Sequence, residues 1–235
     1  LCYFTQEMLS VMKKDSFAGK TVVISGSGNV AIYACKKAVE LGAKVVAMSD
    51  SNGFIYDEKG IDLSVVKEIK EGRRGRIKEY VDAVPTAVYS EGCKGIWGVK
   101  CDVALPCATQ NELDGEAAGK LIANGVIAVA EGANMPCTPE AIAKFQKAGV
   151  LFGPAKAANA GGVATSGLEM SQNSMRYSWT FEEVDKKLHA IMLDIFHSAY
   201  NASQEFGDAG NLVMGANVAG FLKVADAMKW QGVAY

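Results

Sequence analysis

Short apolar runs alternate with amphipathic segments along most of the chain, which is the pattern of an α/β protein. The first run, Thr21–Ser25, is mostly β-branched and predicts a strand buried on both faces of a parallel sheet. A helical segment follows and ends at Gly42, and a second apolar run, Lys44–Met48, predicts the next strand. The residues expected on the buried side of that helix are Val30, Ala34, Ala38 and Leu41. Together these elements predict one βαβ unit.

The later apolar runs predict further strands with helices between them. Strands are expected at Thr86–Tyr89, Cys101–Leu105, Val126–Ala130 and Val150–Phe152, with a short surface hairpin at Phe54–Gly60. Helices are expected at Leu1–Lys14, from Asp62, at Glu116–Ala123, at Thr138–Gly149, at Thr180–Ala199 and at Asn217–Trp230. This alternation predicts an α/β fold with a doubly wound, mostly parallel, Rossmann-like sheet and extra C-terminal helices.

Composition narrows the class of protein. The chain has 235 residues and a formal net charge of −2, so its overall charge offers no attraction to nucleic acid. No apolar run reaches the roughly 18 residues of a membrane-spanning helix, and we expect no membrane association. The six cysteines form no C-x-x-C pair, which favours reduced thiols in a cytoplasmic protein. His189 and His197 are eight residues apart, which does not suit a helical metal pair, so no metal is expected.

A glycine turn joins the first strand to the helix after it. Gly26, Gly28 and Ala31 have the spacing G-x-G-x-x-A that binds dinucleotides in βαβ units. In such a turn the first glycine allows a tight bend, and the second lets a pyrophosphate approach the backbone. The free N–H groups at the start of the helix then face the phosphates. Asp50 follows the second strand, where an acid normally accepts a hydrogen bond from the ribose. The turn therefore predicts nucleotide binding.

Three polar loops are predicted to follow three of the strands directly. They are Pro106–Asn111, Glu131–Asn134 and Pro154–Val163. In an open α/β sheet, ligands bind outside the carboxyl ends of the strands. We therefore expect these segments to form one binding site together with the glycine turn.

Four longer motifs resemble the hexameric glutamate dehydrogenases of the glutamate/leucine/phenylalanine/valine dehydrogenase family. They are PCATQNEL at 106–113, AEGANMP at 130–136, KAANAGGVATSGLEMSQN at 156–173 and GANVAGFLKVADAM at 215–228. The resemblance covers essentially the whole chain. It implies an enzyme that interconverts L-glutamate with 2-oxoglutarate and ammonia by moving a hydride to or from NAD(P).

The resemblance also implies what this chain lacks. In this family the catalytic residues lie on an N-terminal substrate domain, and nothing here matches that domain. We therefore expect residues 1–235 to be a single NAD(P)-binding domain that binds nucleotide without turnover. Its expected parts are an entry helix at 1–14, a Rossmann core at 20–165 and a helical segment at 166–235. This last segment is expected to return to the hinge between the two domains of the full-length protein. The full-length protein is expected to be a homohexamer, and this chain a monomer or weak dimer.

Site residues follow from the same motifs. The resemblance assigns the pyrophosphate to Gly26, Gly28, Asn29 and Val30. It places Cys107, Ala108 and Gln110 beside the ribose and adenine side of the cofactor. It places Asn134 near the nicotinamide ribose, Asn159 near the nicotinamide, and Val163 and Ser166 along the glutamate side chain.

The choice between NAD and NADP stays open at this point. Asp50 favours NAD, because an acid there repels a 2′-phosphate. However, Ser49-Asp50-Ser51, with Ser27 in the glycine turn, resembles the NADP-specific bacterial members. Hydroxyl groups at Ser27 and Ser51 can donate hydrogen bonds to phosphate. A basic cluster could neutralise its charge, or could simply be a solvated helix end; it comprises Lys70, Arg73, Arg74 and Arg76. We favour NADP, with NAD as the alternative.

Two other functions remain as alternatives. One is a dehydrogenase for leucine, phenylalanine or valine, which shares the fold and the hydride chemistry. The motif at 165–173 argues against it, because the family members for apolar amino acids differ there. The other is a nucleotide-sensing module without chemistry.

Overall fold

A computed structural model describes residues 1–232, and its centre is one mixed sheet of seven strands. The strand order is β4-β3-β2-β1-β5-β6-β7, and every pair among β2, β1, β5, β6 and β7 is parallel. Strand β3 is antiparallel to both of its neighbours. The strands are β1 (Thr21–Ile24), β2 (Lys44–Ser49), β3 (Gly53–Tyr56), β4 (Val88–Glu91), β5 (Val103–Leu105), β6 (Ala128–Ala130) and β7 (Leu151–Gly153). The predicted mostly parallel, Rossmann-like fold is confirmed.

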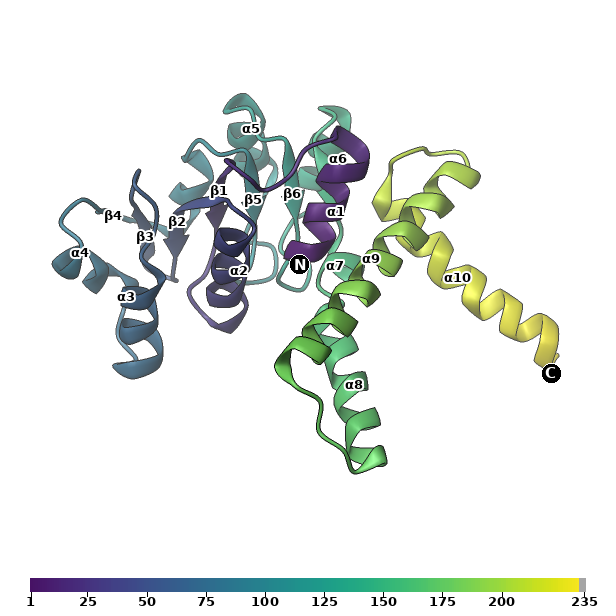
Figure 1. The fold of residues 1–235 in the computed structure, drawn as a ribbon. Coiled ribbons are helices and arrows are strands. Elements are labelled where there is room, and N and C mark those ends of the chain that lie inside the picture. Colours follow the sequence, from purple (N-terminus) through teal and green to yellow (C-terminus); the bar gives the residue numbers. More distant parts are fainter. Residues whose placement is uncertain (233–235) are drawn as a thin grey trace.

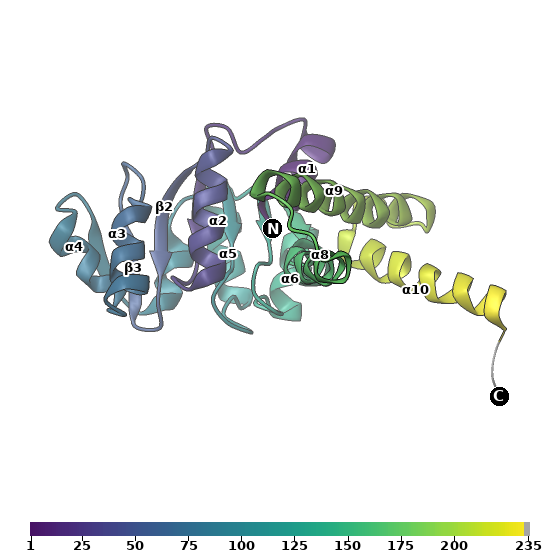
Figure 2. The ribbon, with the colours of Figure 1, turned by 60° about the horizontal axis from the view of Figure 1, so that its bottom comes forward.

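Helices cover both faces of the sheet, as Figures 1 and 2 show. The first face carries α1 (Cys2–Lys13), α2 (Asn29–Glu40) and α3 (Leu63–Lys67), and the second carries η3 (Cys93–Gly98), α5 (Gly115–Ala123) and α6 (Pro139–Lys147). In β1, Val22 and Ile24 pack in the first core while Val23 packs in the second. This double burial explains why the strand is apolar at successive positions.

Short helices occupy the connections along the chain. They are η1 (Glu68–Gly72), η2 (Ile77–Glu79), α4 (Tyr80–Ala83) and α7 (Ala155–Ala158). Three predicted helix starts are confirmed, because the side chains of Asp62, Thr138 and Thr180 each accept a hydrogen bond from the first turn that follows. Thr180 also forms a capping box with Glu183.

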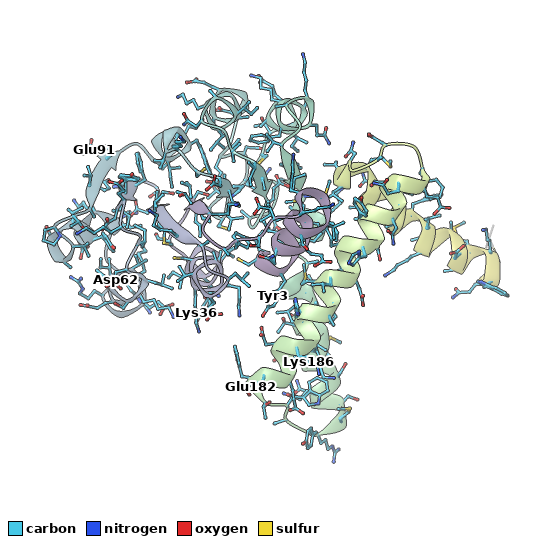
Figure 3. The ribbon with its side chains drawn as sticks, turned by 45° about the horizontal axis from the view of Figure 1, so that its top comes forward. Tyr3, Lys36, Asp62, Glu91, Glu182 and Lys186 are labelled. Carbon is cyan, nitrogen blue, oxygen red and sulfur yellow. The ribbon has the colours of Figure 1, made fainter. Side chains whose placement is uncertain are left out.

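Three long helices follow the sheet and project from it (Figure 1). They are α8 (Gly161–Met175), α9 (Phe181–Glu205) and α10 (Leu212–Gln231). Helix α9 packs against α1, where Phe4 and Phe196 meet edge to face at 5.5 Å. Tyr3, which Figure 3 shows beside α9, donates to the Asp185 carboxylate at 2.7 Å. The first helix of the chain therefore anchors the C-terminal helices to the sheet.

Several local predictions were wrong. Residues 54–60 form no surface hairpin, because β3 is inserted in the sheet and Ile55 is fully buried. The segment 154–163 is not a loop, since it contains α7 and the start of α8. Val30 is 49% exposed rather than buried in the helix face. The last helix begins at Leu212, five residues earlier than expected, after the Asn211 side chain caps it.

Among the described residues, no helix is both long enough and apolar enough to span a membrane.

Candidate functional site

A cavity of about 650 Å³ lies at the carboxyl ends of β5, β6 and β7, next to the start of α2. Four segments that are distant in the sequence contribute to it. The lining residues are Val30, Cys107, Ala108, Thr109, Gln110, Gly132, Ala133, Asn134, Asn159, Gly162, Val163 and Ser166. The structure thus brings together eight of the residues expected from the sequence, because parallel strands end at the same edge of a sheet.

The glycine turn after β1 is packed on one side and open on the other. Gly26 has φ of +89°, and a Cβ there would lie 3.2 Å from the Cys107 carbonyl oxygen. Both the conformation and this close approach require glycine. A Cβ at Gly28 would meet no atom within 4 Å. The turn therefore offers open backbone at Gly28 and Asn29, both exposed, beside the cavity.

Two serine side chains connect the glycine turn to neighbouring strands. The Ser25 hydroxyl accepts a hydrogen bond from the Cys107 N–H at 2.9 Å. The Ser49 hydroxyl accepts one from the Gly26 N–H at 2.8 Å. Ser27 is buried, with 4% of its surface exposed, so it presents little surface to a ligand in this conformation. The turn is held at both sides by groups that lie more than 20 residues away.

The loops after β6 and β7 meet through two asparagines. The Asn159 side-chain amide donates to the Asn134 side-chain oxygen at 2.9 Å. It also lies 3.4 Å from the carbonyl oxygens of Gly132 and Ala133. Both asparagines line the cavity. The pair therefore presents amide groups of fixed orientation to whatever occupies it.

Two carboxylates behind the cavity bond to backbone N–H groups. Glu112 Oε1 accepts from Ala108 at 3.0 Å and from Thr109 at 3.3 Å. Glu131 accepts from the backbones of Cys137 and Ala155. Burial raises the pKa of both carboxyls, although these backbone donors act in the opposite direction.

A second group of expected residues lies away from the cavity, at the turn between β2 and β3. Asp50 Oδ1 accepts from the N–H groups of Asn52 and Gly53, and Oδ2 accepts from Ile77 at 3.0 Å. Burial alone would raise the pKa of Asp50, but these three donors and nearby Lys70 lower it below its usual value. Both oxygens of Asp50 thus hold the turn and the segment before η2.

The residues of the basic cluster lie in different environments. Arg76 Nη1 donates to the Ser51 hydroxyl at 3.0 Å, and both residues are exposed. Arg73 instead pairs with Glu68 at 3.5 Å and with Glu79 at 3.3 Å. Lys70 donates to the Gly75 carbonyl oxygen. Arg74 is exposed. Arg76 is therefore the member of the cluster that bonds to Ser51 in the β2–β3 turn, while Lys70 lies near Asp50.

Sequence reasoning missed several residues of this site. Thr109, Gly132, Ala133 and Gly162 line the cavity within motifs that had been recognised, but no role was given to them. Glu112 and Glu131 were missed as loop supports. The position of Glu131 in the sequence does indicate such a role, because a carboxylate directly after a fully apolar strand must be either exposed to solvent or hydrogen-bonded within the protein.

The chemistry of the cavity is that of binding rather than acid–base catalysis. Among its described lining residues, Cys107 alone is titratable, and burial raises its pKa well above the usual value. The other groups are backbone, amide, hydroxyl and small apolar groups, which suit the orientation of an extended polar ligand. From the cavity past the glycine turn to Ser51 and Arg76, the site follows the carboxyl edge of the sheet.

Comparisons with known proteins show the family of the chain. A family model described as glutamate/leucine/phenylalanine/valine dehydrogenase matches residues 1–232. The chain is 57% identical over 237 residues to the NADP-specific glutamate dehydrogenase of Haemophilus influenzae, covering 99% of this chain and 52% of that protein. It is 55% identical over 234 residues to the NAD(P)-specific glutamate dehydrogenase of Xylanibacter ruminicola, covering 98% and 52%.

Solved structures show the same relationship. The crystal structure of Plasmodium falciparum glutamate dehydrogenase superposes with a TM-score of 0.94 at 46% identity, covering 99% of this chain and 50% of that one. The chain therefore spans about half the length of the relatives it matches.

Proposed function

Because the chain belongs to the glutamate/leucine/phenylalanine/valine dehydrogenase family, we propose that it is the cofactor-binding half of an NADP-dependent glutamate dehydrogenase. The whole enzyme would interconvert L-glutamate with 2-oxoglutarate and ammonia. The observation that carries the proposal is the cavity, where residues of four separate motifs meet at one edge of the sheet. Relatives named glutamate dehydrogenase at 55% identity or more support this substrate over leucine, phenylalanine or valine.

The residues of the site suit a dinucleotide that lies along the sheet edge. We assign the pyrophosphate to the open backbone at Gly28 and Asn29, with Gly26 forming the bend and Val30 beside it. Ala108 and Gln110 would lie along the cofactor, with Cys107 packed beneath. Asn134 and Asn159 would contact the nicotinamide riboside. The bound cofactor would supply hydride transfer, while the residues of this chain bind and orient it.

The substrate would meet this chain at the start of α8. Val163 and Ser166 lie three residues apart on that helix, so they share one face, and both line the cavity beside Asn159. We propose that Ser166 donates a hydrogen bond to the γ-carboxylate of glutamate and that Val163 contacts its methylene groups. The catalytic groups would come from the half of the protein that lies outside this chain.

The contacts at the β2–β3 turn favour NADP over NAD. Both oxygens of Asp50 already accept backbone N–H bonds, so this acid is engaged in holding the turn. Ser51 and Arg76 lie together beside it and can donate to a 2′-phosphate. We propose these two residues as the phosphate contacts, with NAD as the alternative cofactor. Ser27 and Arg73, named with them from the sequence, would contribute less, given the burial of Ser27 and the ion pairs of Arg73.

A direct test uses the 235-residue chain itself. Calorimetric titration is expected to show binding of NADP and weaker binding of NAD. The same chain is expected to produce no glutamate-dependent reduction of either cofactor. Light scattering should find a monomer or weak dimer, since we propose that the hexamer forms through the absent half. Failure to bind either dinucleotide would contradict the proposed function, and robust glutamate oxidation would contradict the division of roles.

Replacing Gly28 with alanine tests the pyrophosphate position. The added methyl meets no protein atom within 4 Å, and the backbone at φ −85° suits alanine, so the melting temperature should not fall. The methyl would occupy the space of the pyrophosphate, so affinity for both NADP and NAD should fall about tenfold or more. Gly119→Ala, which also has open space around its Cβ but lies on α5, is the control and should bind normally. Normal binding by Gly28→Ala would place the pyrophosphate elsewhere.

A further inference from the structure

We propose that Glu131 is a positioning residue, whose buried carboxylate sets Asn134 and Asn159 at the nicotinamide end of the cavity by bonding to two loops at once. The proposal rests on the proposed function for the identity of the ligand. It adds a residue that is not among the lining residues of the candidate cavity. The two N–H groups that bond to its carboxylate lie on segments more than 15 residues apart in the sequence.

The Glu131 side chain connects the loop after β6 to the segment after β7. Glu131 is 4% exposed and follows the last residue of β6. Its Oε1 accepts from the Cys137 N–H at 3.1 Å, and its Oε2 accepts from the Ala155 N–H at 2.7 Å. Its own N–H donates to the Gly153 carbonyl oxygen at 2.9 Å. One residue therefore fixes the end of its own loop and the start of α7.

The two asparagines lie on these same two segments. Asn134 is between Glu131 and Cys137, and Asn159 follows the single turn of α7 that begins at Ala155. The Asn159 amide donates to Asn134 on the cavity side. Because Glu131 fixes the distance between the two segments, it also fixes where this amide pair stands. Loosening either bond would let one asparagine move relative to the other.

A carboxylate is needed because both donors are N–H groups that approach different oxygens. Glutamine has nearly the same shape but offers one carbonyl oxygen and one NH₂ group. Its NH₂ would face either Cys137 or Ala155 and leave that buried N–H without an acceptor. Glu131→Gln therefore removes one bond without creating a cavity, which makes it a selective probe.

The test compares how the 235-residue chain binds NADPH, a whole dinucleotide, and 2′,5′-ADP, which is the adenosine half of it. For Glu131→Gln, affinity for NADPH is expected to fall about tenfold, because the amide pair no longer meets the nicotinamide riboside in its bound geometry. Affinity for 2′,5′-ADP, which lacks that half, should change less than about twofold. NMR hydrogen exchange of the Ala155 or Cys137 amide should become about tenfold faster. This exchange needs no ligand.

A second variant removes the same bond from the donor side. Ala155→Pro lacks the N–H that Oε2 accepts, and proline is tolerated at the first position of a helix. It should reproduce the selective loss of NADPH affinity. Asp102→Asn is the control, because Asp102 accepts from the Thr21 N–H at the opposite edge of the sheet, and one oxygen suffices there. It should bind both ligands normally.

The outcomes distinguish a failure of the positioning role of Glu131 from a failure of the proposed function. Equal losses for NADPH and 2′,5′-ADP would show a general structural effect and overturn the positioning role. Unchanged NADPH affinity in both Glu131→Gln and Ala155→Pro would also overturn it. A wild-type chain that binds neither ligand would instead contradict the proposed function, and the amide exchange would still decide whether Glu131 holds the two loops.

Discussion

Replacing Arg76 with alanine is expected to weaken NADP binding about 30-fold, since hydrogen bonds to charged groups contribute roughly 1.5–3 kcal/mol. Arg76 Nη1 lies 3.0 Å from the Ser51 hydroxyl, at the turn where a 2′-phosphate would be held. NAD has no phosphate there, so its affinity should change less than about twofold. Calorimetric titration of both dinucleotides into the variant measures the difference. The expected result is a selective loss that brings the two affinities closer together.

Arg73→Ala provides the matched control for this change. Arg73 lies three residues earlier and carries the same charge, but it pairs with Glu68 and Glu79. These pairs are exposed, and exposed ion pairs contribute little to stability. Removing Arg73 should therefore leave NADP affinity within about threefold and the fold intact. Equal losses for the two variants would mean that the cluster acts through its summed charge. Unchanged NADP binding in Arg76→Ala would remove Arg76 from the site.

Replacing Gly215 with alanine is expected to lower the free energy of unfolding by about 3 kcal/mol, near the upper end of typical overpacking costs. A Cβ at this position would lie 2.0 Å from the Ala199 carbonyl oxygen and 3.1 Å from the Ser203 Cβ. Both are parts of α9, and the backbone there cannot move aside as a flexible side chain could. The alanine would force α10 away from α9 at their crossing. Urea denaturation monitored by circular dichroism measures the effect.

Gly220→Ala on the same helix controls for helix propensity. A Cβ there meets no atom within 4 Å. Alanine at an open helical position should stabilise by about 0.5–1 kcal/mol, because glycine is the poorer helix former. The two substitutions should thus change stability in opposite directions. If Gly215→Ala were as stable as the wild-type chain, α10 would have to shift along α9 without cost.

The features that the sequence predicted correctly depend on neighbouring residues. Buried strands, and their alternation with helices, follow from the runs of apolar residues along the chain. Helix starts follow from a side chain that bonds to the backbone within three residues of itself. Thr138 and Thr180 are of this kind. The cavity was also foreseen in outline, because motifs that directly follow parallel strands must meet at one edge of the sheet. Neither prediction needed distances between remote side chains.

The predictions that failed depended on packing that is not local. Residues 54–56 joined the sheet because β2 and β4 pair with them on either side. Val30 sits on the expected helix but faces the cavity, since the rotation of that helix is set by the packing of Ala31, Ile32 and Cys35. The pattern of segment 154–163 predicted a loop, yet the segment contains α7 and the start of α8.

The sequence alone determined the fold class, the family and the edge of the sheet where the candidate cavity lies, because each follows from local patterns and strand ends. Only the tertiary structure decided how the site is held. There, Asp50 accepts a hydrogen bond from the backbone of Ile77, 27 residues away, and Arg76 rather than Arg73 donates to Ser51. The tertiary structure also placed Glu131 between two loops. These contacts join residues 6 to 27 positions apart whose side chains have no periodic signature, so only the folded backbone brings them within hydrogen-bonding distance.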